Sequence, residues 1–157
     1  MAKNFDELLS KVSSCSKKKL SVAVAQDKAV LEAVKAAKER GIADSILVGD
    51  ADKIKEIADS IDMNLADYEV IDVKDIVEAS LKAVSLVHDG KADMYLKGLL
   101  DTKTFLKSVL DKEVGLRTGK PLSHVCVFEI PGIDRLVFLT DVAFIPYPTF
   151  RLRQHFS

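Results

Sequence analysis

The stretch KADMYLKGLLDTKTFLKSVLDKEVGLRTGKPLSH, residues 91–124, decides how this chain folds. It starts with a short apolar segment at 93–97, typical of a buried strand, which ends at Gly98. An amphipathic helix is predicted to begin near Asp101 or Thr102, and a basic, glycine-bearing loop follows it. Because backbone amides point outward at the start of a helix, the sequence predicts an anion site where this strand gives way to the helix.

Basic side chains accompany the predicted anion site. They could supply positive charge for a phosphate group or a nucleotide tail. Lys103 and Lys107 lie four residues apart on the expected helix, and such a pair taken alone is typical of a solvated helix face. The basic residues of the stretch are Lys97, Lys103, Lys107, Arg117 and Lys120.

On the N-terminal side of this stretch, strand and helix signals alternate along the chain. Asp27 is a predicted helix cap, and Gly41 a predicted helix stop. Such alternation indicates a layered α/β domain with a mostly parallel sheet and right-handed crossovers. The expected strands cover 20–26, 45–48 and 68–73, and the expected helices cover 4–14, Asp27 to Arg40, 53–60 and Val77 to Asp89, with His88 favouring the helix dipole in the last turn.

After Pro121 the pattern changes to two apolar, β-rich segments, LSHVCVFEI and DRLVFLTDVAF, separated by the turn PGID. They predict two consecutive strands, for which an antiparallel pair is one arrangement. We expect a single α/β domain over residues 1–144, followed by an atypical, proline-containing tail at 145–157.

Composition narrows the function classes. With 23 basic and 24 acidic side chains, the formal net charge is -1, so no global field favours nucleic acid or an anionic membrane. No apolar run approaches the roughly 20 residues of a membrane helix, and we expect a cytoplasmic protein. Cys15 and Cys126 form no CxxC pair, which indicates neither a zinc site nor a disulfide framework, and Cys126 is expected to be a small buried hydrophobe.

Familiar catalytic fingerprints are missing from the sequence, including the P-loop, GxGxxG, HExxH and GxSxG. Ser123 and His124 are adjacent, so on a strand they point to opposite faces and do not form a nucleophile–base pair with each other. One of them could face a cleft, with capping or core roles as the alternatives. Asp141 ends an apolar strand, where either a functional carboxylate or a turn-forming one fits.

The segments VAVAQDKAVLEAV, GIADSILVGD, KADMYLKGLLDTKTFLKSVLDKEVGLRTGKPLSHVCVFE and DRLVFLTDVAF resemble the N-terminal half of the phosphate acetyl/butyryltransferase family, over about residues 20–144. The resemblance implies reversible transfer of butyryl, or a similar short acyl group, between coenzyme A and inorganic phosphate. Coenzyme A and butyryl phosphate would be substrates, with no other cofactor and no metal. The implied fold is a three-layer α/β/α domain with a mostly parallel sheet, resembling the first domain of the isocitrate/isopropylmalate dehydrogenase-like fold.

The resemblance also assigns roles to residues. Lys107 falls where relatives commonly carry arginine, so bidentate phosphate recognition is reduced to a point charge. The coenzyme A thiol would be deprotonated and attack the acyl phosphate carbonyl directly. The implied phosphate or acyl-phosphate ligands are Lys97, Gly98, Thr102, Lys107, Arg117, Thr118 and Gly119, and the implied catalytic residues are Ser123, His124 and Asp141.

Two departures from the family pattern qualify this expectation. The family continues from TDVAF into an asparagine and a long helix, whereas Ile145 follows here. Family members also carry a second half with a serine–arginine–aspartate group for coenzyme A. We therefore expect the chain alone to be inactive or nearly so, and to form a homo-oligomer. The alternatives are a non-catalytic half-domain that binds acyl phosphate or coenzyme A, and a subunit completed by a partner chain.

Overall fold

The computed structural model describes residues 3–12, 14–120 and 122–141. Within it the chain divides into two compact units: a larger unit over 15–118, and a smaller unit that combines the first 14 residues with those from Gly119 onward. That they form one domain over 1–144 stays a prediction, and the expected tail at 145–157 lies outside the described residues.

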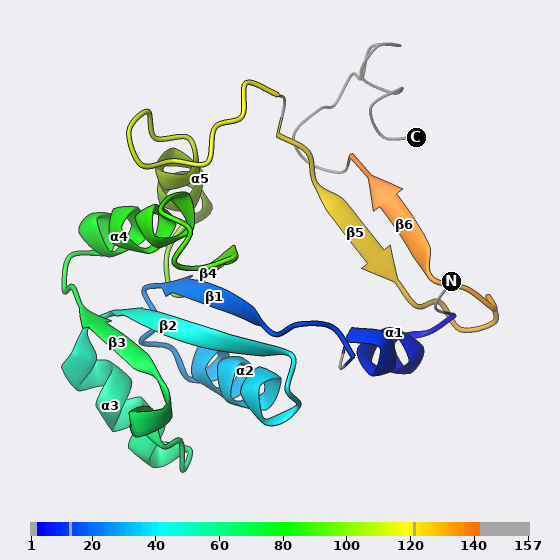
Figure 1. The fold of residues 1–157 in the computed structure, drawn as a ribbon, viewed down its shortest axis with the longest axis horizontal. Coiled ribbons are helices and arrows are strands. Elements are labelled where there is room, and N and C mark those ends of the chain that lie inside the picture. The colour runs from blue at the N-terminus through cyan, green and yellow to red at the C-terminus, as the bar shows by residue number, and fades with distance from the viewer. Residues whose placement is uncertain (1–2, 13, 121, 142–157) are drawn as a thin grey trace. The chain divides into compact units, whose positions relative to one another are not determined.

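A four-stranded parallel sheet forms the centre of the larger unit (Figure 1). Its spatial order is β3-β2-β1-β4, so the chain builds outward from β1 in one direction and then crosses to its other side. The mostly parallel sheet predicted from the sequence is confirmed. Its strands are β1 (Lys18–Ala23), β2 (Ala43–Gly49), β3 (Glu69–Asp72) and β4 (Met94–Lys97).

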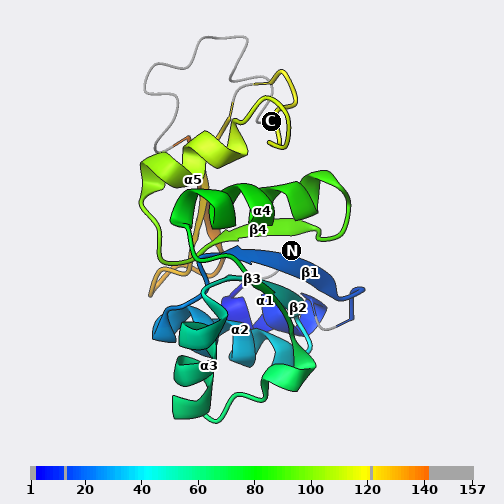
Figure 2. The ribbon, with the colours of Figure 1, turned by 90° about the vertical axis from the view of Figure 1, so that its left-hand side faces the viewer.

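Helices cover both faces of this sheet, which gives the three layers expected of the α/β/α class. In Figure 2, α2 and α3 lie on one side of the strands, and α4 and α5 lie on the other. A short 3₁₀ turn, η1 (Leu65–Asp67), precedes β3. The helices are α2 (Lys28–Glu39), α3 (Ala51–Ser60), α4 (Ile76–His88) and α5 (Thr102–Val109).

Aspartates start each of these four helices. The predicted cap Asp27 is confirmed, since its carboxylate accepts a hydrogen bond from the Val30 amide at 3.0 Å. Asp50, Asp75 and Asp101 cap α3, α4 and α5 in the same way. A capping carboxylate satisfies amides that have no partner within the helix, so these short i to i+3 contacts define the helix starts locally.

The core consists of two apolar clusters, one on each face of the sheet. Val22 and Leu47 pack with Leu31 of α2 on one face. Ala23 and Val48 pack with α4 on the other. Because both faces are covered, consecutive residues such as Val22 and Ala23 of β1, and Leu47 and Val48 of β2, are all buried instead of alternating with exposed ones.

The first strand is shifted from its predicted range of 20–26 to Lys18–Ala23. At its start, Lys18 and Lys19 pair with β2, and their ammonium groups bind Asp93 at 3.1 Å and Glu69 at 3.2 Å. At its end, Val24 turns to φ 54° and leaves the ladder. The sequence pattern placed the start of the strand at residue 20, but pairing with β2 extends it back to Lys18.

The smaller unit contains α1 (Phe5–Val12) and an antiparallel ribbon of β5 (Val125–Phe128) and β6 (Val137–Thr140). The two predicted strands are therefore confirmed, although both are shorter than their apolar segments. The amide of Phe5 donates to the Glu129 carboxylate at 2.8 Å, which ties the start of α1 to the end of β5. Among the described residues, no helix has the length and apolar character needed to cross a membrane.

Candidate functional site

The carboxyl ends of β1 and β4 lie side by side where the strand order reverses, which is the usual place for a ligand in an open α/β sheet. At this point Gly98 lies close to the end of β1, and its amide donates a hydrogen bond to the Ala23 carbonyl at 2.9 Å. A Cβ atom on Gly98 would overlap the carbonyl oxygens of Ala23 and Val24. Glycine is therefore required here by the contact between two strand ends.

This geometry corrects one expectation from the sequence. The amides of Gly98 and Leu99 donate to β1 and the residue after it, and the Leu100 amide donates to the Gly98 carbonyl, each at 2.9 Å. The prediction that this segment aims its amides at an anion is wrong for these three residues, because each amide already has a backbone acceptor. Phosphate binding by Lys97 and Thr102 stays a prediction.

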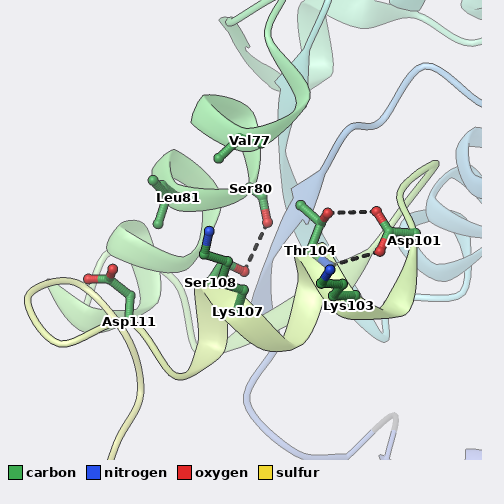
Figure 3. Close-up of a pocket in the computed structure, with 9 residues that line it drawn as sticks. All are labelled: Val77, Ser80, Leu81, Asp101, Lys103, Thr104, Lys107, Ser108 and Asp111. Atoms are coloured by element: carbon green, nitrogen blue, oxygen red, sulfur yellow. Dashed lines mark hydrogen bonds between the residues drawn. The ribbon is translucent and has the colours of Figure 1, made fainter.

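A carboxylate already occupies the start of α5. Asp101 accepts hydrogen bonds from the Thr104 hydroxyl at 2.6 Å and the Thr104 amide at 2.9 Å (Figure 3). These two bonds, the hydroxyl bond first, hold the pKa of Asp101 below its ordinary value, so the group is ionised at neutral pH. An anion at this helix start would therefore need lysine side chains to offset the negative charge.

Beside α5 lies a pocket of about 430 Å³, a volume within the range of small-molecule sites. Its walls come from α4 and α5, and its ends carry Asp101 and Asp111 (Figure 3). The remaining lining residues are Val77, Ser80, Leu81, Lys103, Thr104, Lys107 and Ser108.

Buried hydroxyl groups join the two pocket walls. Ser80 of α4 donates to the Ser108 oxygen of α5 at 2.9 Å, and the Tyr95 hydroxyl lies 2.8 Å from Ser80 and 3.0 Å from Ser108. Tyr95 also stacks on Phe105 with ring centroids 4.8 Å apart. Satisfied buried polar groups hold helices in one arrangement, so this network fixes the shape of the pocket.

Sequence reasoning missed these hydroxyl-bearing residues. Ser80 and Ser108 each interrupt the apolar stripe of an expected helix, which is a signal that such a side chain has a buried partner. The signal does not say which partner, because Ser80, Tyr95 and Ser108 belong to three different elements.

The acidic and basic side chains around the pocket differ in their bonding partners. The Asp111 carboxylate accepts the amides of Val114 and Glu113 at 3.0 and 2.8 Å, which lower its pKa, and Asp101 is bound by Thr104. By contrast, neither Lys103 nor Lys107 belongs to an ion pair among the described residues. The pattern alone indicated a solvated face for these lysines, but both line the pocket and can meet an anion.

The basic loop after α5 is anchored as far as Leu116. The Leu116 amide donates to the Val109 carbonyl at 2.8 Å, and His88 Nδ1 lies 3.0 Å from the Gly115 carbonyl oxygen. His88 is in the last turn of α4 as predicted, and its contact ties the loop to that helix. The predicted ligands Arg117 and Thr118 follow this anchor directly.

Two of the three predicted catalytic residues meet in the smaller unit. The amide of His124 donates to the Asp141 carboxylate at 2.9 Å, so Asp141 contacts the backbone of His124. Ser123 is half-buried beside them. Cys126, expected to be buried, is only half-buried, because the sheet that carries it has two strands in the described chain.

The predicted site residues are divided between the two units. The phosphate-binding set lies in the larger unit except for Gly119, and the catalytic set lies in the smaller unit. That the two sets form one site stays a prediction. Within the described ranges, no group of three or more His, Cys, Asp or Glu side chains is arranged to hold a metal ion.

Comparison with known proteins finds one family. A model of the phosphate acetyl/butaryl transferase family matches residues 4–78 and 73–152. The phosphate butyryltransferase of Clostridium beijerinckii is 60% identical over 151 residues, which are 96% of this chain and 50% of that protein. The phosphate butyryltransferase of Clostridium acetobutylicum is 60% identical over 148 residues, 94% of this chain and 49% of that protein.

A solved structure supports the same fold. The branched-chain phosphotransacylase from Enterococcus faecalis superposes with a TM-score of 0.67 at 26% identity, over 88% of this chain and 47% of that chain. The finer likeness to an isocitrate/isopropylmalate dehydrogenase-like domain stays a prediction. This chain spans about half the length of the curated relatives that it matches.

Proposed function

The chain belongs to the phosphate acetyl/butaryl transferase family, and from this premise we propose that it forms part of a phosphate acyltransferase. The proposed reaction transfers butyryl, or a similar short acyl group, between coenzyme A and inorganic phosphate. Coenzyme A is a substrate in this proposal, and no metal takes part.

The pocket between α4 and α5 supports the proposal most directly. The ammonium groups of Lys103 and Lys107, which form no ion pair within the described part of the chain, can hold a phosphate. The apolar wall at Val77 and Leu81 suits a short hydrocarbon. A compound that combines a phosphate with a short acyl chain matches both features. Because lysine binds as a point charge, it restrains the orientation of the phosphate less than arginine would.

In the proposed reaction, the deprotonated sulfur of coenzyme A attacks the carbonyl carbon of the acyl phosphate. A sulfur–carbon bond forms, the carbon–oxygen bond to phosphate breaks, and phosphate leaves with its bonding electron pair. Cations beside the leaving group stabilise its growing negative charge, which is the role we give Lys107 and Arg117. Lys97 and Thr102 would hold the phosphate on the side of β4.

The smaller unit supplies the candidates for proton transfer. His124 can accept the proton of the attacking thiol, and the Asp141 carboxylate positions His124 through its 2.9 Å bond to the backbone. Ser123 would orient the carbonyl group. These roles follow the family resemblance and require the two units to meet at one site.

Activity is tested by phosphate-dependent release of thiol from butyryl-CoA. Because the chain spans about half the length of its relatives, we expect the 157-residue chain alone to be inactive or nearly so. Turnover at a rate ordinary for phosphate acyltransferases would overturn this expectation and leave the family assignment intact.

Binding is tested separately by titration calorimetry of the 157-residue chain with butyryl phosphate. Lys107→Ala should weaken binding about tenfold, the effect of losing roughly 1.4 kcal/mol of charge-assisted hydrogen bonding. Lys82→Ala is the matched control, since Lys82 is an exposed α4 lysine outside the pocket. Equal affinities of the two variants would remove Lys107 from the site.

A further inference from the structure

A thiol and an imidazole lie in contact at the start of β5, where His124 directly precedes the strand and Cys126 belongs to it. Cys126 Sγ is 3.8 Å from His124 Nδ1 and 3.9 Å from His124 Nε2. The two residues are two apart along an extended segment, so their side chains emerge on the same face. Both residues are half-buried.

The pair is held in place by both strands of the ribbon. Val125, between the two residues, pairs with Thr140, and the next residue along, Asp141, accepts the His124 amide at 2.9 Å. The backbone on either side of the histidine is thus bound to β6 or to the residue that follows it. The sulfur is almost equally far from both ring nitrogens, so the thiol and the base are held in contact, and proton transfer to either nitrogen requires a rotation of the imidazole from this position.

From this arrangement we propose that Cys126 is a modification site that reacts with the disulfide of a small thiol compound to form a mixed disulfide. His124 takes the thiol proton, and the Cys126 thiolate attacks one sulfur of the disulfide. A new sulfur–sulfur bond forms, the original one breaks, and the other half leaves as a thiol with the proton from His124. The small disulfide is the oxidant, so electrons and atoms balance. This inference does not depend on the proposed function.

Cys15 provides an internal reference because it is the chain's other cysteine and is exposed. If accessibility alone decided reactivity, Cys15 would react faster than the half-buried Cys126. If the contact with His124 decides it, Cys126 reacts faster. Comparing the reaction rates of Cys15 and Cys126 in the unaltered chain therefore distinguishes the two explanations.

The test uses the 157-residue chain and the neutral probe 2-hydroxyethyl disulfide at neutral pH, with each mixed disulfide followed by peptide mass spectrometry. We expect Cys126 to react on the order of tenfold faster than Cys15. His124→Gln should remove this advantage and leave the Cys15 rate unchanged. Faster reaction at Cys15 in the unaltered chain, or an unchanged rate ratio in the variant, would overturn the proposal.

A second measurement covers the case in which His124→Gln fails to fold. In concentrated urea the unaltered chain loses the contact between His124 and Cys126, so the two cysteines should then react at similar rates. A Cys126 advantage that persists in urea would mean that local sequence, and not the folded contact, makes the thiol reactive, and would contradict the proposal.

Discussion

The parallel sheet of the larger unit and the ribbon of the smaller unit carry similar apolar side chains in different surroundings. Leu47 of β2 is 0% exposed, whereas Phe138 of β6 is 58% exposed and Val125 of β5 is 54% exposed. Helices cover both faces of the first sheet. The comparison teaches that an apolar strand pattern indicates a strand in both regions, but its contribution to stability depends on the layers packed against it.

The largest effect should come from removing a buried side chain in the sheet. Leu47→Ala should cost about 3 kcal/mol of unfolding free energy, because it removes buried methyl groups and leaves a cavity. Phe138→Ala should cost less than about 1 kcal/mol, because an exposed ring loses little burial. Urea denaturation of both variants measures the difference, and equal costs would show that the ribbon is covered in solution.

Gly98 gives the next largest effect, because it joins β1 to β4. Gly98→Ala should cost about 2 kcal/mol or more, since the new Cβ overlaps the Ala23 and Val24 carbonyl oxygens and forces the strand ends apart. The control is Gly90→Ala, because a Cβ atom at Gly90 would meet no other atom. Only the left-handed φ of 71° opposes a side chain there, so this variant should lose about 1 kcal/mol of unfolding free energy. A smaller cost at Gly98 than at Gly90 in urea denaturation would contradict the close approach.

The hydroxyl network between α4 and α5 should have a smaller effect. Tyr95→Phe keeps the ring stacked on Phe105 but removes the hydroxyl that lies within 3.0 Å of Ser80 and Ser108. We expect a loss of about 1 kcal/mol by urea denaturation. Hydrogen exchange should also speed up in α5, and an unchanged exchange rate there would mean that the network does not fix the pocket wall.

Substitution of Asp101 should have the smallest effect on stability, and this effect depends on pH. Its pKa is lowered in the folded chain by Thr104, so its stabilising contribution is present above the unfolded pKa of about 4 and is lost as pH falls through the folded value. Asp101→Asn keeps a capping side chain but does not titrate. The urea midpoint of the unaltered chain should exceed that of the variant at pH 7, and this gap should narrow by about pH 3. A gap that is the same at both pH values would contradict the assignment.

Much of the fold could be predicted from local patterns. The alternation of strands and helices, the cap at Asp27 and the final pair of strands all depend on residues close together in the chain. The start of β1 could not be predicted, because pairing with β2 extends the strand to include Lys18 and Lys19.

The candidate site divides in the same way. The positions and charges of Lys103 and Lys107 in the sequence indicated that they could supply positive charge for a phosphate. The family resemblance further implied that Lys107 is a phosphate ligand. Sequence did not indicate that both lysines line a pocket with buried serines, since Ser80 and Ser108 meet only when α4 packs on α5. The contact of Cys126 with His124 was also missed, although their spacing of two on a strand was its visible signal.

By itself, the amino-acid sequence determined the order of the elements, the helix starts and, through resemblance, the family. The elements and helix starts follow from side-chain periodicity and from contacts between residues a few positions apart, and both can be recognised in the sequence. Only the tertiary structure decided that the Gly98 amide bonds to Ala23 and that Lys103 and Lys107 remain without carboxylate partners among the described residues. Whether an amide or an ammonium group has a hydrogen-bonding or ion-pair partner depends on atoms from distant parts of the chain. Only packing of the folded chain brings those atoms together.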